Sequence, residues 1–181
     1  MAGEGWLMAV ILIGIGANLA PDGYTTPKLG CEAAIACLAG KDIAVTAIST
    51  WYETAPVPVS DQPWFNNAVI AAETALPAED ALAALHEIEA RFGRVRTVRN
   101  AARVLDLDLL DYGGQCHDGG GLTVPHPRLH ERAFVLLPLR DVAPDYVHPG
   151  SKIHIDELIS RLPPDQMVRP LGSGNSGKAA G

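Results

Sequence analysis

Apolar and polar residues alternate most regularly between residues 104 and 110, past the middle of the 181-residue chain. Three leucines there face one way, and Asp106 and Asp108 face the other. A period of two is typical of a β-strand with one buried face, so a strand is predicted over these residues. Apolar stretches at residues 8–15, 43–52 and 68–74 predict three further strands.

Helix start and stop signals occur twice between these strands. Thr26 as N-cap and Pro27 behind it predict a helix that runs to about residue 39 and stops at Gly40. Pro77 opens a second helix, whose apolar residues recur at helical spacing until Gly93 ends it. The order of elements is therefore strand, helix, strand, strand, helix, strand.

This order is that of the ferredoxin-like βαββαβ fold, an α+β class in which an antiparallel sheet carries helices on one face. Glycines at residues 113–114 and 119–121 add a hairpin, and apolar runs at 132–139 and 155–162 add C-terminal helices. No repeat or linker divides the chain. We therefore expect one domain over residues 1–171 and a flexible glycine-rich tail at 172–181.

The N-terminal apolar stretch and the cysteines bear on the cellular compartment. Residues 6–15 are too few to span a membrane, and no basic segment precedes them. The three cysteines are an odd number without metal-ligand spacing, which favours free thiols in a reducing environment. We expect a cytoplasmic protein that has no membrane partner.

Positive charge is concentrated in one short segment of an acidic chain. Residues 91–103 hold five of the ten arginines and no acidic residue, while the net charge of the whole chain is −7. A broad nucleic-acid-binding surface needs a basic face, which this composition does not favour. A local cluster instead favours a small anionic ligand. A second cationic group follows at His126, Arg128, His130 and Arg132.

The two aspartates of the first predicted strand require an explanation, because strand interiors disfavour this residue. Residues two apart on a strand lie ~7 Å apart, so Asp106 and Asp108 could share hard cations such as Mg²⁺. The solvated face of an edge strand is the alternative for an isolated D-x-D pattern. The adjoining arginines favour the metal, since they would meet the phosphates that accompany it.

Three other features have both a ligand-binding and a purely structural interpretation. Phe65 and Asn67 suit a flat heterocycle, but a core phenylalanine and a turn asparagine are the simpler alternative. Glu89 lies where the helix dipole disfavours an acid. A ligand or an arginine partner would account for it, although a solvated surface glutamate is simpler. Glycines at residues 14 and 16 predict a tight turn, either for packing or for phosphate.

A series of motifs then occurs in an order that resembles one enzyme family. The motifs are I-G-I-G-A-N-L at 13–19, S-T-W-Y-E-T-A-P-V at 49–57, D-Q-P-W-F-N-N-A at 61–68, I-E-A-R-F-G-R-V-R at 88–96, R-V-L-D-L-D-L-L at 103–110, V-P-H-P-R at 124–128 and R-A-F-V-L-L-P-L at 132–139. Over residues 13–149 the chain resembles the 6-hydroxymethyl-7,8-dihydropterin pyrophosphokinases of folate biosynthesis. The pairing of R-x-L-D-L-D with P-H-P-R is the most specific part.

The resemblance implies pyrophosphoryl transfer from ATP to the pterin hydroxymethyl group, leaving AMP. It implies that Asp106 and Asp108 bind two Mg²⁺ ions, and that Arg94 and Arg103 take part in catalysis. Implied ATP contacts are Glu89, Arg96, Leu109, His126 and Arg132. Implied pterin contacts are Thr54, Val57, Phe65, Asn67 and Phe134. ATP and the pterin are the expected partners of a monomer, with no nucleic acid.

One departure from the family concerns residues 97–102. Well-known members carry a tryptophan and a W-x-P-R pattern in this catalytic loop, whereas the chain reads N-A-A-R up to Arg103 and is one residue shorter. We expect this loop to close over the phosphates and exclude water. Without the aromatic residue, closure would depend more on charge.

Two alternatives remain open at this point. A ferredoxin-like sheet can bind RNA, but the aromatic signature and basic surface of such modules are absent from the sequence. A two-metal nucleotidyl transferase could use the same D-x-D pair. Its product would be pyrophosphate, whereas pyrophosphoryl transfer releases AMP.

Overall fold

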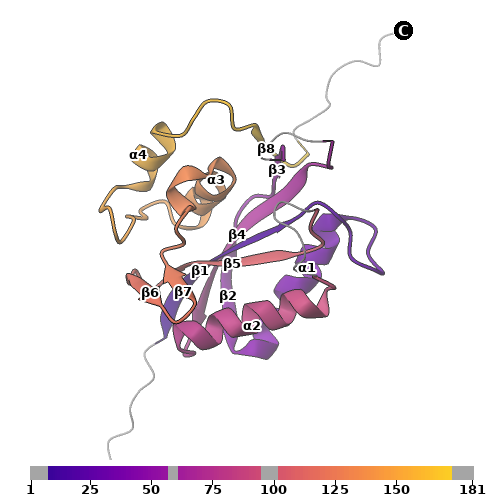
Figure 1. Ribbon diagram of the computed structural model, residues 1–181, viewed down its shortest axis with the longest axis horizontal. Helices are drawn as coiled ribbons and strands as arrows, with labels where there is room; N and C mark the ends of the chain where they lie inside the picture. Colours follow the sequence, from indigo (N-terminus) through magenta and orange to yellow (C-terminus); the bar gives the residue numbers. More distant parts are fainter. Residues whose placement is uncertain (1–7, 57–60, 95–101, 173–181) are drawn as a thin grey trace, which may run out of the picture.

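A six-stranded antiparallel sheet forms the centre of the molecule in the computed structural model, which describes residues 8–56, 61–94 and 102–172. Its strands are β1 (Ala9–Ala17), β2 (Ile43–Ile48), β3 (Tyr52–Thr54), β4 (Phe65–Thr74), β5 (Asp106–Tyr112) and β8 (Val168–Pro170). The strand order is β5-β1-β4-β3-β8, and β2 pairs with the other end of β4 (Figure 1). Short β6 (His117–Gly119) and β7 (Leu122–Val124) form a separate hairpin.

Helices cover both faces of this sheet (Figure 1). Helices α1 (Pro27–Leu38) and α2 (Ala78–Arg91) pack on one face. Helices α3 (Ala133–Val142) and α4 (Ile155–Ser160) form the second layer on the opposite face, where α3 crosses β4. Two single-turn 3₁₀ helices, Ala39–Lys41 and Leu129–Glu131, complete the described elements.

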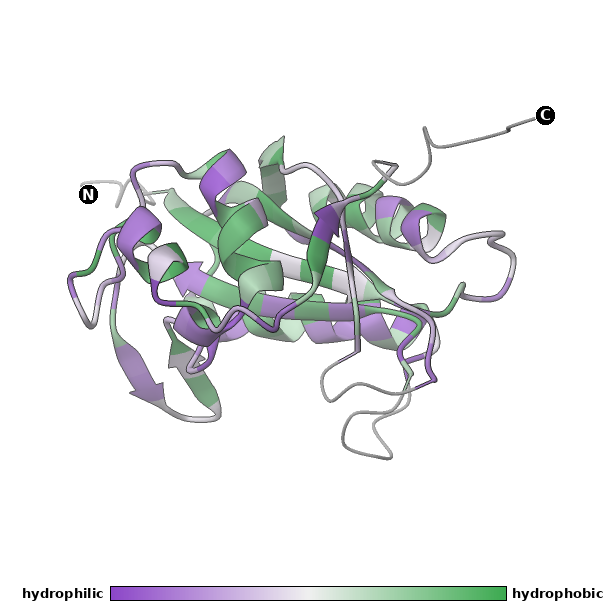
Figure 2. Cartoon of the chain, turned by 90° about the horizontal axis from the view of Figure 1, so that it is seen from above, coloured by the Kyte–Doolittle hydropathy of each residue, from purple (hydrophilic) through white to green (hydrophobic). Residues whose placement is uncertain are grey.

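Strand β1 shows why two layers form. Ile11, Ile13 and Ile15 belong to the core beneath α1 and α2, whereas Leu12 belongs to the core beneath α3 and α4. Because successive side chains of a strand point to opposite faces, a strand that is apolar at every position needs cover on both sides. Hydrophobic residues accordingly follow the central strands in Figure 2.

The predicted helix starts are confirmed, and several boundaries need correction. The Thr26 side chain accepts a hydrogen bond from the Leu29 amide, and Pro77 precedes α2. The first helical segment does not stop at Gly40, because a 3₁₀ turn continues to Lys41 and Asp42 adopts the left-handed conformation, φ 57°. The predicted strand at 43–52 is broken into β2 and β3.

The remaining differences concern the length of β1, the start of β4 and one additional strand. No turn forms at Gly14 and Gly16, because β1 continues through both glycines to Ala17. Strand β4 begins at Phe65, three residues before the predicted start, so Asn67 lies in a strand and not in a turn. Strand β8 was not predicted. Within the described residues, no helix is both long and apolar enough to cross a membrane.

Candidate active site

A cavity of about 930 Å³ lies between the sheet and the layer formed by α3 and α4. Its floor is β1, where Gly14 and Gly16 take the place of side chains on this face. Eight of the predicted site residues line it: Thr54, Phe65, Asn67, Arg103, Asp106, Asp108, Arg132 and Phe134. The structure therefore brings the predicted metal-binding, catalytic and pterin-binding groups to one cavity.

Asp106 and Asp108 enter this cavity from β5, opposite the two glycines of β1. The Asp106 side chain is 16% exposed and forms ion pairs with Arg94 and Arg103. Its Oδ1 atom lies 2.6 Å from Arg94 Nη1, yet this buried oxygen accepts no hydrogen bond from the described residues. Asp106 is thus not the solvated face of an edge strand, because β5 buries it against cations.

Burial raises the pKa of Asp108, and the neighbouring charge of Asp106 raises it further, against the attraction of His126 and two arginines. Two carboxylates held together in a low-dielectric cavity are a favourable site for a divalent cation, which would relieve their repulsion. Among the described residues no group of three or more His, Cys, Asp or Glu side chains could hold a metal. A pair of carboxylates is nevertheless sufficient for Mg²⁺, which completes its coordination with phosphate oxygens and water.

Glu89 has a structural position that its sequence context did not indicate. Its side chain is 1% exposed, so the solvated surface interpretation is wrong. Glu89 Oε1 accepts a hydrogen bond of 2.7 Å from the Leu107 amide and forms an ion pair with Arg94. An arginine partner, one of the two explanations for its unfavourable position on α2, is confirmed. Arg94 in turn connects Glu89 to Asp106 across β5.

The opposite end of the cavity carries an amide and two aromatic rings. Asn67 is 7% exposed on β4, and its Nδ2 donates to Thr54 Oγ1 at 2.7 Å. Phe65 lies two residues earlier, directly across from Thr54 in the sheet. Phe134 enters from the first turn of α3, where the Arg132 guanidinium lies 5.4 Å from the centre of its ring. A flat polar heterocycle matches this combination of rings and one edge-binding amide.

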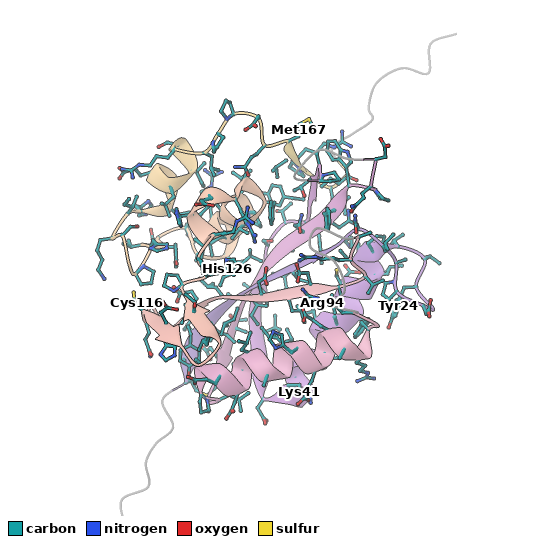
Figure 3. The ribbon with its side chains drawn as sticks, viewed as in Figure 1. Tyr24, Lys41, Arg94, Cys116, His126 and Met167 are labelled. Atoms are coloured by element: carbon teal, nitrogen blue, oxygen red, sulfur yellow. The ribbon has the colours of Figure 1, made fainter. Side chains whose placement is uncertain are left out.

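Other predicted residues lie beside the cavity or outside the described part of the chain. The Leu109 side chain packs in the core beneath α1 and α2, on the face of the sheet opposite to the cavity. Its backbone pairs with Ile13 of β1. His126 donates its backbone amide to Leu110 O, and burial lowers the pKa of its ring. Figure 3 labels Arg94 near the start of β5 and His126 near its far end. Val57, Arg96 and residues 97–101 of the predicted closing loop fall outside the described residues.

Comparison with known proteins decides the family. The model of the 7,8-dihydro-6-hydroxymethylpterin-pyrophosphokinase (HPPK) family matches residues 12–144. The chain belongs to this family. A 2-amino-4-hydroxy-6-hydroxymethyldihydropteridine pyrophosphokinase of Pseudomonas aeruginosa is 38% identical over 164 residues, covering 90% of this chain and 98% of that protein. One of Haemophilus influenzae is 36% identical over 163 residues, covering 90% and 98%.

Longer HPPK relatives match only in part. The folic acid synthesis protein fol1 of Pneumocystis carinii is 38% identical over 131 residues, which cover 72% of this chain and 18% of that protein. Among solved structures, a Plasmodium falciparum HPPK-DHPS triple mutant aligns with a TM-score of 0.66 at 14% identity, covering 87% of this chain and 45% of that chain. At this identity the structural match shows the HPPK fold alone. The chain spans less than half the length of these two relatives.

Sequence reasoning about the HPPK site missed Asn18. This residue is 2% exposed, and its Oδ1 accepts from the Arg103 amide at 2.7 Å. Its Nδ2 donates to Gln62 Oε1 and to Pro63 O, so one side chain joins the segments that precede Phe65 and Asp106. The only signal is the asparagine in the first family motif, which follows the two glycines for which a turn, either for packing or for phosphate, is predicted. Gln166, which unlike Asn18 is a lining residue of the cavity, gave no signal at all.

Proposed function

We propose that the chain transfers a pyrophosphoryl group from ATP to the hydroxymethyl group of 6-hydroxymethyl-7,8-dihydropterin, releasing AMP, in folate biosynthesis. The observation that carries this proposal is one cavity in which two partly buried carboxylates face arginines at one end and an amide with two aromatic rings at the other. Relatives named as pyrophosphokinases, which match 90% of the chain, support it.

The proposal includes a structural frame for this activity. Strands β1, β2, β4 and β5, with α1 and α2, follow the ferredoxin-like βαββαβ order, and α3 and α4 are additions that close the cavity. Residues 1–171 would act as one catalytic domain of a cytoplasmic monomer, with residues 172–181 as a tail. The cavity lies where the additions meet the sheet.

In this mechanism the pterin hydroxyl attacks the β-phosphorus of ATP in line with the leaving AMP. Asp106 and Asp108 would hold two Mg²⁺ ions, which neutralise charge on the transferring phosphates. Asn67, held by Thr54, would donate to and accept from the pterin edge, while Phe65 and Phe134 stack on its faces. The aromatic walls orient the hydroxymethyl group toward the carboxylate pair.

The arginines and His126 would bind the nucleotide. Arg103 and Arg132 line the cavity, and Arg94 reaches Asp106 from behind β5. Charge-assisted bonds from such groups to phosphate oxygens stabilise the charge that develops in the transition state. Catalysis would then consist mainly of positioning and charge neutralisation, since no covalent intermediate is required.

Product identity tests the proposal directly. The purified chain, given ATP, MgCl₂ and 6-hydroxymethyl-7,8-dihydropterin, should form AMP and the pterin diphosphate in equal amounts, as measured by anion-exchange chromatography. Pyrophosphate in place of AMP would instead establish nucleotidyl transfer, which the carboxylate pair could also support. ATP consumption that is independent of the pterin would contradict both forms of transfer to this substrate.

Isosteric variants of Asp106 and Asp108 test the role of the carboxylate pair in this assay. Asp106→Asn and Asp108→Asn should each lower kcat by about 100-fold or more, because several kcal/mol of charge stabilisation are lost. Asp145→Asn is the control, because Asp145 is exposed and is not a lining residue of the cavity. Near-normal turnover of both site variants at saturating Mg²⁺ would refute the metal assignment.

A further inference from the structure

The two aromatic walls of the cavity belong to parts of the chain that are far apart in sequence, and residues 166–169 bond to residues next to each wall or paired with it. Phe65 starts β4, and Phe134 lies in the first turn of α3. Residues 166–169 lie outside the region matched by the HPPK family model. Figure 1 shows the chain passing from α4 over the α3 layer to β8, which lies beside β3.

Gln166 holds the start of α3. Its Oε1 accepts from the Ala133 amide at 2.8 Å, and its Nε2 donates to Glu131 O at 2.8 Å. The first amides of a helix have no partner within the helix, and the N-cap residue Arg132 makes no capping bond with its side chain. Gln166 therefore supplies, from 33 residues away, the acceptor that a local cap would provide.

The next residues hold the opposite wall through the backbone. Met167 O accepts from the Ala55 amide at 3.2 Å, and Val168 pairs with Thr54 in the ladder of β8 with β3. Thr54 itself pairs with Phe65 on β4 and accepts the Asn67 amide through its hydroxyl. One residue separates Gln166 from Val168, a span of ~7 Å along an extended chain.

Arg169 contacts Trp64, the residue before Phe65. Its guanidinium lies 4.7 Å from the centre of the Trp64 ring. Its Nε and Nη2 atoms each lie 2.9 Å from Glu53 Oε2. A cation stacked on an indole and paired with a carboxylate has a defined orientation, so Trp64 is held against the edge of the sheet.

We propose that residues 166–169 act as a clamp that sets the separation of the two pterin-binding walls, with Gln166 as its main positioning residue. The inference rests on the proposed function, because it assigns the clamp to the pterin subsite. A flat ring between two aromatic side chains needs walls roughly 7 Å apart, with each face about 3.5 Å away. Gln166 bonds to the start of α3, which carries Phe134, and Met167 and Val168 bond to β3 and Ala55, beside Phe65. Because these residues are adjacent in the chain, a movement of one wall should also move the other.

The clamp predicts a selective loss of pterin affinity. Gln166→Ala removes both bonds to the start of α3 and should weaken pterin binding by about tenfold, the equivalent of one or two hydrogen bonds. Binding of a non-hydrolysable ATP analogue with MgCl₂ should change by less than about twofold. Gln166→Glu keeps the acceptor for Ala133 and should restore part of the pterin affinity. Gln115→Ala is the matched control, since its exposed side chain lies outside the cavity lining.

A double-mutant cycle tests the coupling between the two walls. Arg169→Ala should also weaken pterin binding, Arg169→Lys should restore part of it, and the combined loss in Gln166→Ala/Arg169→Ala should be smaller than the product of the single losses. Isothermal titration gives both ligand affinities, and circular dichroism verifies folding. Unchanged pterin affinity in Gln166→Ala, equal loss for pterin and ATP analogue, or strictly multiplicative losses would overturn the clamp. Wild-type protein that binds no pterin would overturn the proposed function instead.

Discussion

Gly16 determines how closely Asn67 can approach the floor of the cavity. A Cβ atom at this position would lie much closer to Asn67 Oδ1 than van der Waals contact allows. The neighbour is the polar end of a side chain that already donates to Thr54 through its other terminal atom. The glycine therefore allows a close approach of an amide and does not form a turn.

Gly16→Ala should displace the Asn67 amide and weaken pterin binding by about tenfold or more, because a polar group of the site loses its alignment. The ATP-analogue affinity should be nearly unchanged. Gly40→Ala is the matched control, because a Cβ there meets no atom within 4 Å. Isothermal titration with each ligand measures the difference. Normal pterin affinity in Gly16→Ala would show that Asn67 does not read the pterin edge.

Asp111 is a buried carboxylate that the mechanism does not use. It is 3% exposed, and it accepts from the Gly114 amide at 2.8 Å and from the Tyr146 hydroxyl at 3.0 Å. Burial raises its pKa, and these two donors with the nearby His148 only partly offset the rise. In the pH range between its unfolded and folded pKa values, the folded chain retains a proton that the unfolded chain has released.

A raised folded-state pKa gives a contribution to stability that is present below the ordinary carboxylate range and is lost as the pH rises through the folded value. Asp111→Asn cannot lose this proton. The free energy of unfolding of the variant, relative to the wild type, should therefore increase between about pH 4 and neutral pH. Urea denaturation across this range measures it, and Asp145→Asn should show no such trend. A difference that is constant or decreasing with pH would contradict the prediction.

At the scale of elements, the break between β2 and β3 is closed by one side chain. Ser49 is 6% exposed and lies between the two strands, opposite Val69 of β4. Its amide donates to Val69 O, and its Oγ accepts from the Val69 amide, both at 2.9 Å. The serine thereby replaces ladder bonds that the irregular register would otherwise leave unmade.

Ser49→Ala should lower the free energy of unfolding by about 1–3 kcal/mol, because the buried Val69 amide loses its acceptor. Ser160→Ala is the control, an exposed serine at the end of α4 that should change stability by less than about 0.5 kcal/mol. Urea denaturation of both variants gives the comparison. Equal stability of Ser49→Ala and wild type would mean that water or a shifted strand supplies the missing acceptor.

The elements that could be predicted from sequence are those whose signals are local. Alternation identified β5 and the shared face of Asp106 and Asp108, and capping residues identified α1 and α2. Strand β8 has three residues, of which one is proline, and its partner β3 lies more than 110 residues earlier. No local pattern marks such a strand, because its stability comes from the edge that it joins.

Side chains of the site divide in the same way, into those marked by a local sequence motif and those whose contacts depend on the fold. The predicted metal-binding and pterin-binding residues came from short motifs, each continuous in sequence, and most of them line one cavity. Arg94, the partner of Glu89, lies only five residues away in sequence. The Leu107 amide, by contrast, reaches the Glu89 carboxylate only because α2 packs on β5. Asn18 and Gln166 likewise bond to residues between 33 and 85 positions away. Sequence spacing carries no information on such contacts.

At the scale of the whole molecule, an acidic chain concentrates its arginines around an acidic pair. Net charge is −7, yet Arg94 and Arg103 both form ion pairs with Asp106. Arg103 is 36% exposed on the cavity side, whereas Arg94 is 17% exposed and also bonded to Glu89. Of these two arginines, Arg103 is therefore the one that we expect to exchange Asp106 for a phosphate.

This exchange gives Arg103→Ala a pattern of effects that a simple binding residue would not produce. Without the guanidinium, the carboxylates lose a neutralising partner, so Mg²⁺ should bind more tightly in the absence of nucleotide. The value of kcat should fall by about 100-fold, because a donor to the transferring phosphate is missing, while ATP affinity changes only a few-fold.

Added salt should slow the wild type by screening the contact between Arg103 and the phosphate. Arg140→Ala, which removes an exposed ion pair between residues outside the cavity lining, should change none of these values. Titration calorimetry with MgCl₂ and steady-state kinetics provide the measurements. A large loss of ATP affinity with unchanged kcat would reassign Arg103 to ground-state binding of the nucleotide.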